Sequence, residues 1–290
     1  MFKNVSATFS IQGEPIQVHA VSTGAVAVKT KFRESRKKGW RAQLDFLLDK
    51  RFTEWMPIWV WIIEHPEGIF IIDTGENTRV NSPGYFKSSG MFSNWINTTQ
   101  FRFQVSRADE IDQQLIRLGI DKSIVHAVVL THLHLDHVDG LYHFPETRIV
   151  VHRREWEKPY GNLPKLYPYW LQPDLITLDT PYKTFSQAQF LTKAKDLIAV
   201  HTPGHTYGHM SVLLKTDTCH ILFAGDICYY EEQVTHQRFS GINVTYKGAE
   251  NSYANIRALA QQEPLIFLPS HDANAGERLA SHAFLNFDRG

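Results

Sequence analysis

The sequence has little of several features that define other classes of protein. Only two cysteines, Cys219 and Cys228, occur among 290 residues, which excludes a disulfide-stabilised scaffold and favours a reducing compartment. The longest apolar run, residues 55–63, contains Pro57 and is far too short to span a membrane. The N-terminal residues show no apolar stretch typical of a secretory leader. We therefore expect a cytoplasmic protein that does not enter a membrane.

Charge of one sign is not in excess either. Thirty Lys and Arg residues match thirty Asp and Glu residues, so no overall field would attract nucleic acid or an anionic membrane. Residues 29–41 depart locally from this balance, with seven basic residues against Glu34 alone. Such a run is usually a solvated loop or helix face, and the other interpretation is a lip that attracts an anionic group.

Motifs for several other chemistries are missing. The sequence has no G-x-G-x-x-G motif and no P-loop, so dinucleotide and nucleoside triphosphate chemistry have no support. It also has no G-x-S-x-G elbow and no serine set for a catalytic triad. A hydrolase built on this chain would need a nucleophile that is not a serine side chain.

Apolar patterns predict strands that alternate with helices. Residues 59–64 and 69–73 flank His65-Pro66-Glu67-Gly68, a type I turn sequence, and should pair as a hairpin that leads into Asp73-Thr74-Gly75. Expected strands are 16–21, 25–30, 59–64, 69–73, 125–130, 148–151, 197–201, 210–215 and 220–225, and expected helices are 106–118 and 252–262. This alternation in both halves predicts an α/β layered fold, and no shift in composition divides residues 1–290 into more than one domain.

The strongest signal is a cluster of metal-ligand residue types directly after the strand expected at 125–130. Within Thr131-His132-Leu133-His134-Leu135-Asp136-His137, His132 and His134 share one face of an extended chain and can bind one cation together. Asp136 and His137 continue the loop and could bind a second cation. Three imidazoles and a carboxylate within six residues are hard to explain by packing, so we predict a metal site.

Three further candidate ligands follow apolar runs elsewhere in the chain. His205 comes after the turn at Pro203-Gly204, Asp226 ends the run 221–225, and His271 follows the run 265–270. Open α/β sheets place their ligands just outside the carboxyl ends of strands. The repetition of this arrangement indicates that the three side chains converge on the first cluster.

These residues together resemble the signature of the metallo-β-lactamase superfamily, an HxHxDH motif followed by distant His, Asp and His. The resemblance covers roughly residues 55–275 and includes the Asp73-Thr74-Gly75 motif. It implies an αββα four-layer sandwich with two divalent metal ions at the edge of its sheets. By this resemblance the ligands of one ion would be His132, His134 and His205, those of the other would be Asp136, His137 and His271, and Asp226 would bridge the two.

Nearby residues receive other roles. We expect His209 to contact a metal ligand rather than a metal, His201 to belong to a strand or pocket wall, and Cys228 to fill buried space. Mixed imidazole and carboxylate ligands suggest zinc, although iron, manganese or cobalt would also fit.

The reaction expected of such a site is hydrolysis. Two cations that share a carboxylate would hold a water and lower its pKa, so that hydroxide attacks a carbonyl group near neutral pH. Within the superfamily the sequence is most similar to the N-acyl-homoserine lactonases. In those enzymes a tyrosine stands three residues after the bridging aspartate, as Tyr229 stands three residues after Asp226 here. The resemblance implies that Tyr229 donates to the lactone carbonyl oxygen and that Asp136 returns a proton to the leaving alkoxide. The expected partner is a small-molecule substrate, a quorum-sensing lactone, rather than nucleic acid or a membrane.

Other activities are alternatives within the same fold. They are a glyoxalase II-like thioesterase, a generalist lactonase or esterase, and a phosphodiesterase; the first usually has an extra C-terminal region, whereas nineteen residues follow His271 here. Flavodiiron proteins have Glu at the position of His134, and a non-enzymatic scaffold would have broken ligands. Residues 29–41 and the aromatic segment 84–105 have no counterpart that we can place in the lactonases; they would form the acyl-chain pocket or a contact in a homodimer.

Overall fold

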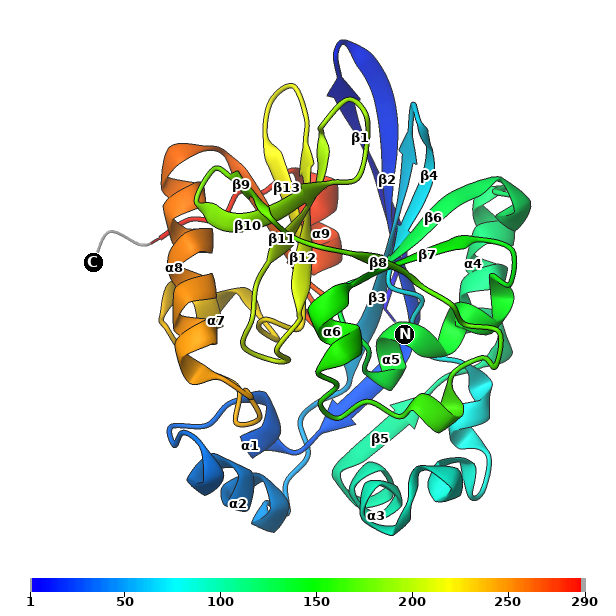
Figure 1. Ribbon diagram of the computed structural model, residues 1–290, viewed down its shortest axis with the longest axis vertical. Coiled ribbons are helices and arrows are strands. Elements are labelled where there is room, and N and C mark those ends of the chain that lie inside the picture. The colour runs from blue at the N-terminus through cyan, green and yellow to red at the C-terminus, as the bar shows by residue number, and fades with distance from the viewer. Residues whose placement is uncertain (1, 288–290) are drawn as a thin grey trace.

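The computed structural model describes residues 2–287, which form two β-sheets packed face to face (Figure 1). The first sheet has the strand order β1-β2-β3-β4-β6-β7-β8, with β5 paired to β2, and the second has the order β14-β13-β12-β11-β10-β9. The strands of the first sheet are β1 (Val5–Ile11), β2 (Glu14–Val28), β3 (Met56–His65), β4 (Gly68–Ile72), β5 (Phe101–Gln104), β6 (Val125–Leu130), β7 (Arg148–His152) and β8 (Asp174–Ile176). Those of the second are β9 (Thr180–Tyr182), β10 (Phe185–Phe190), β11 (Leu197–His201), β12 (Met210–Lys215), β13 (His220–Gly225) and β14 (Leu265–Pro269).

Helices lie outside this pair of sheets and in the loops at one end of it (Figure 1). The α-helices are α1 (Thr30–Arg33), α2 (Trp40–Leu48), α3 (Met91–Gln100), α4 (Ile111–Leu118), α5 (Leu135–Val138), α6 (Arg153–Glu157), α7 (Glu231–Thr235), α8 (Tyr246–Gln262) and α9 (Ala275–Ser281). Short 3-10 helices are η1 (Thr78–Asn81), η2 (Tyr85–Ser89), η3 (Arg107–Asp109), η4 (Lys122–Ile124), η5 (Asp139–His143) and η6 (Pro164–Leu166).

Three hydrophobic clusters separate four layers. The largest cluster lies between the sheets, where the rings of Trp61 and Phe223 meet with their centroids 5.5 Å apart. A second cluster buries Ile111 and Leu115 of α4 against the outer face of the first sheet, and a third buries the apolar face of α8 against the second sheet. Burying one such large apolar side chain stabilises the fold by about 1.5–3 kcal/mol. The order helix, sheet, sheet, helix is the αββα sandwich that the sequence predicts.

Most expected elements are confirmed. The hairpin of β3 and β4 turns at residues 65–68, and β6, β11, β12 and β13 have the expected bounds. The central strands β4, β6 and β7 are parallel and almost wholly buried because both faces of the sheet are covered. Their carboxyl ends therefore point to one edge of the sandwich.

Some boundaries predicted from the sequence are wrong. Residues 16–21 and 25–30 are one bent strand, β2, because Gly24 adopts φ 128° at a register shift and the chain continues through it. Ser106 and Asp109 do form a capping box, but it begins the 3-10 helix η3, and α4 starts only at Ile111. The helix expected at 252–262 begins earlier, at Tyr246.

One continuous hydrophobic cluster lies between the sheets, and a single domain over residues 1–290 stays a prediction from the sequence. Within residues 2–287, no helix is long and apolar enough to cross a bilayer.

Candidate metal centre

All of the predicted ligands meet at the edge of the sandwich where β6, β11, β13 and β14 end. The loop after β6 supplies four of them, and the loop after β11 supplies His205. Asp226 and His271 follow β13 and β14, which are adjacent parallel strands. Each of these side chains stands just past the carboxyl end of a strand, which is where α/β sheets place their ligand sites.

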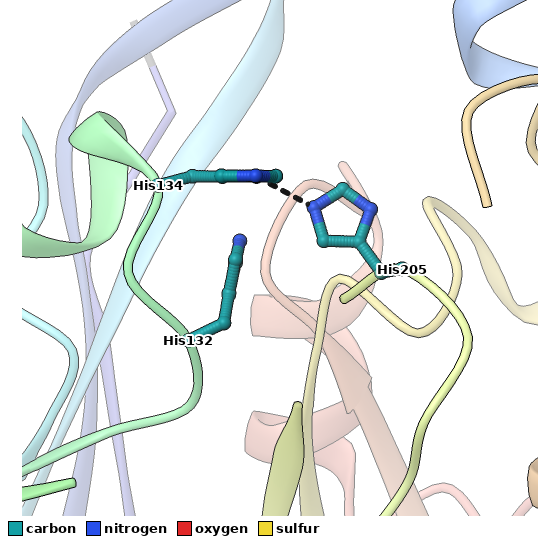
Figure 2. Close-up of side chains that lie close together, drawn as sticks. All are labelled: His132, His134 and His205. Atoms are coloured by element: carbon teal, nitrogen blue, oxygen red, sulfur yellow. Dashed lines mark hydrogen bonds between the residues drawn. The ribbon is translucent and has the colours of Figure 1, made fainter. Parts of the chain in front are cut away.

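Three imidazoles form the first group. His132, His134 and His205 each offer a ring nitrogen, and these nitrogens lie within 4.8 Å of one another. Figure 2 shows the three rings directed toward a common point from two loops, with His134 Nδ1 2.8 Å from His205 Nε2. Three ring nitrogens that meet at one point are the usual donors of a zinc site.

A second group lies beside the first. Asp136, His137 and His271 also offer ligand atoms within 4.8 Å of one another. Asp226 stands between the groups: its Oδ1 is 3.2 Å from His137 Nε2 and 3.3 Å from His271 Nε2, and its Oδ2 is 3.6 Å from His205 Nε2. One carboxylate thus presents a separate oxygen to each group.

The donor set fits a metal pair. His132 Nε2, His137 Nε2 and Asp226 Oδ1 are buried and have no hydrogen-bond partner among the described residues. Buried polar atoms without partners are costly, by about 1–3 kcal/mol each, and native proteins avoid them except where a ligand or ion satisfies them. Their orientation toward the shared centre supports the interpretation that cations belong there.

In three of the predicted ligands, the other ring nitrogen is held by the protein. His137 Nδ1 lies 2.8 Å from Asp73 Oδ2, and His271 Nδ1 lies 2.8 Å from the carbonyl oxygen of Pro57. His134 Nε2 lies 2.8 Å from the carbonyl oxygen of Tyr160. Acceptors at these positions place the proton on the outward nitrogen and leave the inward nitrogen free to bind a metal.

Glu155 on α6 joins the two loops that carry the three-histidine group. Its Oε1 accepts a hydrogen bond from Leu133 N, between His132 and His134, at 3.2 Å. Its Oε2 accepts from Thr206 Oγ1 at 2.6 Å and from Gly208 N at 3.2 Å. The carboxylate is almost fully buried. A single side chain therefore fixes the backbone next to all three histidines.

Burial and neighbouring charges set the protonation of the metal-free site. Burial lowers the pKa of His132 and of His205 well below the usual range, so both are neutral. Burial also acts on His271, but the Asp226 and Asp136 carboxylates raise its pKa by more, to about 10. Burial raises the pKa of Asp226, whereas His271 and His137 lower it by more, which leaves this carboxylate ionised.

His209 holds Asp226 without joining either group. Its Nδ1 lies 3.0 Å from the carbonyl oxygen of Thr202, and its Nε2 accepts from Asp226 N at 3.0 Å. Burial lowers the pKa of His209 to about 3, so it is the neutral tautomer that accepts this bond. Gly225 reaches φ 59°, and a Cβ there would stand 2.6 Å from His209 Nε2, so this close approach requires glycine.

Two other residues lie where the sequence places them. His201 ends β11 and contacts Gln187 and the carbonyl oxygen of Tyr207, away from the ligand groups. Cys228 is completely buried within the cluster beneath α8, and burial raises the pKa of its thiol well above the usual range.

Tyr229 borders the ligand groups from the side of an apolar cavity. Its ring stacks on His271 with centroids 5.6 Å apart. Burial, together with the Asp226 and Asp136 carboxylates, raises the pKa of Tyr229 well above its usual value, so the hydroxyl keeps its proton. The cavity has a volume of about 450 Å³, and its lining includes Asp136, Asp226 and His271 at one end.

Residues of both segments, 29–41 and 84–105, and of α2 belong to the apolar wall of this cavity. Phe32 and Phe46 come from α1 and α2, and Ile96, Phe101 and Phe103 come from α3 and β5. Segment 84–105 consists of η2, α3 and β5, and three of its aromatic residues, Phe92, Phe101 and Phe103, line the cavity. The basic residues of 29–41 are mostly exposed; Lys37 and Lys38 form ion pairs with Asp45 and Glu250.

Sequence reasoning missed two residues that hold the ligands in place. Asp73 accepts from His137 and from Thr131, and it adopts φ 60° directly after β4. A carboxylate at the end of a buried strand signals a partner, as it does for Asp226. Nothing in the sequence distinguishes Glu155 from the other acidic residues of 153–157.

A further cluster of ligand types is explained by ion pairs. Glu110, Asp112 and His143 lie close together. Arg107 lies 3.1 Å from Glu110 and also contacts Asp112, and His143 lies 2.9 Å from Glu110. Arg107 already pairs with both carboxylates, so this cluster does not by itself indicate a cation site.

Comparison with known proteins agrees with this fold. The sequence model of the Metallo-beta-lactamase superfamily matches residues 53–271, and the chain belongs to this superfamily. A curated relative is the N-acyl homoserine lactonase of a Bacillus species, 28% identical over 224 residues, 75% of this chain and 82% of that protein. Another is N-acyl homoserine lactonase AttM of Azorhizobium caulinodans, 28% identical over 232 residues, 76% of this chain and 83% of that protein.

Solved structures share the whole architecture. An N-acyl homoserine lactone hydrolase, solved with the product N-hexanoyl-L-homoserine at its catalytic metal centre, superposes with a TM-score of 0.71 at 20% identity over 92% of this chain and 94% of that one. AidC, described as a dizinc quorum-quenching lactonase, gives a TM-score of 0.61 at 14% identity over 93% of this chain and 90% of that one. At these identities the likeness confirms the fold.

Proposed function

We propose that this protein is a two-metal hydrolase that opens the ring of N-acyl-homoserine lactones, a quorum-quenching activity. The observation that carries the proposal is the position of the ligand groups: both meet at Asp226, on the floor of an apolar cavity that Tyr229 borders. Relatives named as N-acyl homoserine lactonases support the choice of substrate.

In this proposal each group binds one divalent cation. His132, His134 and His205 would hold the first, Asp136, His137 and His271 would hold the second, and Asp226, which lies between the two groups, would serve both. Zinc is the metal we favour, since imidazole nitrogen and carboxylate oxygen together suit it. Bound cations would supply hydroxide near neutral pH and polarise the carbonyl that is attacked.

Two side chains of the site act on the substrate's own atoms. The protonated hydroxyl of Tyr229 donates a hydrogen bond to the lactone carbonyl oxygen as negative charge develops on it. Asp136, which is partly exposed toward the cavity, accepts the proton that the attacking water loses and passes it to the alkoxide of the opened ring. His209 and Glu155 hold the ligands without touching the substrate.

In this proposal the cavity binds the acyl chain of the substrate. Its wall is mostly aromatic and aliphatic, and its volume of about 450 Å³ is in the range of small-molecule sites. Such a wall excludes water from the site and binds a hydrocarbon chain, which a simple ester or a phosphodiester does not carry. Long-chain thioesters are the strongest competing substrates. A cytoplasmic location and a homodimer stay predictions from the sequence.

The test is ring opening by the purified protein. A pH-indicator assay over lactones of short and long acyl chain, with simple esters and thioesters for comparison, measures the acid that each hydrolysis releases. We expect efficient opening of acyl-homoserine lactones, its loss in Asp226→Ala, and weak activity on the other substrates. Asp272→Asn, at a buried carboxylate outside the ligand groups, serves as the control for Asp226→Ala. If the protein with both metals bound opens no lactone, the proposal that its substrate is a lactone is refuted, and the proposal that it is a two-metal hydrolase still stands.

A further inference from the structure

Exposed apolar side chains gather on two helices, α2 and α3. Both helices lie at the same end of the molecule, below the sheets in Figure 1, and both line the large cavity. The residues in question are Trp40, Leu44 and Leu48 on α2 and Met91, Phe92 and Trp95 on α3. We call these six residues the apolar rim. Surface apolar residues are usually scattered singly, so a group of this size calls for an explanation.

The rim residues follow helical spacing. Trp40, Leu44 and Leu48 occur four residues apart, so they form one stripe along α2. Trp40 and Leu48 are 69% and 68% exposed, although Ala42 and Phe46 of the same helix are buried. On α3, Met91 and Trp95 are also four residues apart, and Met91 is 93% exposed. Each helix therefore has an apolar face toward the protein and a second one toward solvent.

The rim continues into the cavity. Phe92 is exposed and also lines the cavity, and Leu47, next to Leu48, lines it from α2. Phe46 and Ile96 lie deeper on the same walls. The rim and the cavity that holds the ligand groups at its lining therefore share apolar side chains.

Positive charge surrounds the rim. Residues 29–54 contain nine Lys and Arg residues against four Asp and Glu residues, and residues 84–104 contain Lys87 and Arg102 with no acidic residue. The chain as a whole carries 30 of each kind, so the rest of the chain has 19 basic and 26 acidic residues, and the two segments that carry the rim differ from it in sign. Arg36 and Arg41 are exposed, and the Arg41 guanidinium lies 5.5 Å from the Trp40 ring centroid.

We propose that the apolar rim docks this protein on the surface of an anionic phospholipid bilayer. Tryptophan and leucine beside lysine and arginine are the composition of protein surfaces that lie in the membrane interface, where apolar side chains enter the acyl boundary and cations meet phosphate groups. A second copy of this chain fits less well, because a two-fold interface through the rim would place two positively charged surfaces against each other.

Docking in this orientation turns the cavity mouth toward the lipid. A substrate with a long acyl chain dissolves in the bilayer, and its chain could pass from lipid into the cavity along the rim. This consequence rests on the proposed function, whereas the docking itself does not, because lipid binding is measured without any substrate.

The experiment is flotation of the metal-loaded protein with vesicles of phosphatidylcholine alone or of phosphatidylcholine mixed with phosphatidylglycerol. We expect binding to the mixed vesicles, at least tenfold weaker binding to the neutral ones, and release as salt is raised. The variant Trp40→Ser with Leu48→Ser should bind the mixed vesicles at least tenfold more weakly. Its matched control is Ile116→Ser with Ile124→Ser, two residues of similar exposure remote from the rim in sequence, which should bind as the parent does.

Three results would overturn the proposal. They are no binding to the mixed vesicles, equal loss of binding in the control variant, and a dimer in solution that the rim variant dissociates. The last result would assign the rim to a second copy. Circular dichroism of each variant checks that it is folded, and lactone opening assayed in detergent-free buffer reports the proposed function separately from docking.

Discussion

Replacing Glu155 by glutamine tests how the three-histidine group is held. The carboxylate accepts hydrogen bonds from Leu133 N on one oxygen and from Thr206 Oγ1 and Gly208 N on the other. Glutamine has one accepting oxygen, and its NH₂ group can only donate. Whichever way the amide is turned, the NH₂ group faces a backbone N–H, so at least one of these contacts becomes repulsive.

The size of the effect follows from the balance of two terms. A buried donor without a partner costs about 1–3 kcal/mol, and a hydrogen bond to a charged group contributes about 1.5–3 kcal/mol. Burial raises the pKa of Glu155, so removing its charge recovers part of the cost of burying it. We therefore expect a net loss of about 2 kcal/mol, which corresponds to roughly thirtyfold in the affinity of the ion held by the three histidines.

The assay is metal content after dialysis against increasing concentrations of a chelator. Glu155→Gln should lose one ion at a concentration where the parent keeps two, and it should keep the other. Glu157→Gln is the matched control, since Glu157 lies on the same short helix, is exposed and pairs only with Arg153 at 3.6 Å. Retention of both ions, or parallel loss of both ions and of the fold, would refute a role specific to this group.

The remaining predictions concern the reaction, protonation and substrate choice. Tyr229→Phe should lower kcat about 100-fold while metal content is unchanged, because it removes a donor to the developing oxyanion; unchanged kcat would contradict this role. Metal uptake at pH 8 should release protons, which a pH indicator measures. Burial lowers the pKa of His271, but Asp226 and Asp136 raise it by more, to about 10 in the metal-free protein. His271 is therefore protonated at pH 8 and must lose its proton to bind a metal. The raised pKa of His271 also stabilises the metal-free protein. This contribution is fully present below pH 6.5, the pKa of an unfolded histidine, and is lost as the pH rises through about 10. The free energy of unfolding of the metal-free protein, measured in urea, should therefore be lower at pH 10 than at pH 7. Ile96→Trp places a larger side chain in the cavity and should lower kcat/KM for decanoyl-homoserine lactone about tenfold more than for butanoyl-homoserine lactone. An equal change for both substrates would show that α3 does not contact the acyl chain.

The metal ligands could be read from the sequence because each stands at the end of an apolar strand. His132 to His137 follow β6 directly, and Asp226 and His271 follow β13 and β14. In a parallel arrangement the ends of such strands meet at one edge, so a list of strands already predicts which residues converge. The alternation of strand and helix predicts the layers for the same reason.

Other features depend on contacts that no local pattern contains. The composition of residues 16–30 predicts two strands separated at Gly24. The chain instead forms one strand, because β3 pairs with it on both sides of the bend and β5 pairs with residues 25–28 beyond the bend. Glu155 has its role only because α6 packs between two loops that lie far apart in sequence. The apolar rim arises from two segments whose common cavity could not be foreseen from either one alone.

The measurement that tests the central claim most directly is lactone opening during stepwise metal addition to the metal-free protein. Activity toward a long-chain N-acyl-homoserine lactone is followed per equivalent of zinc, and mass spectrometry identifies the product as the ring-opened acyl-homoserine. The account predicts that activity reaches its maximum at two equivalents per chain, because Asp226 joins two ligand groups. Full activity at one equivalent, or activity without metal, would contradict it.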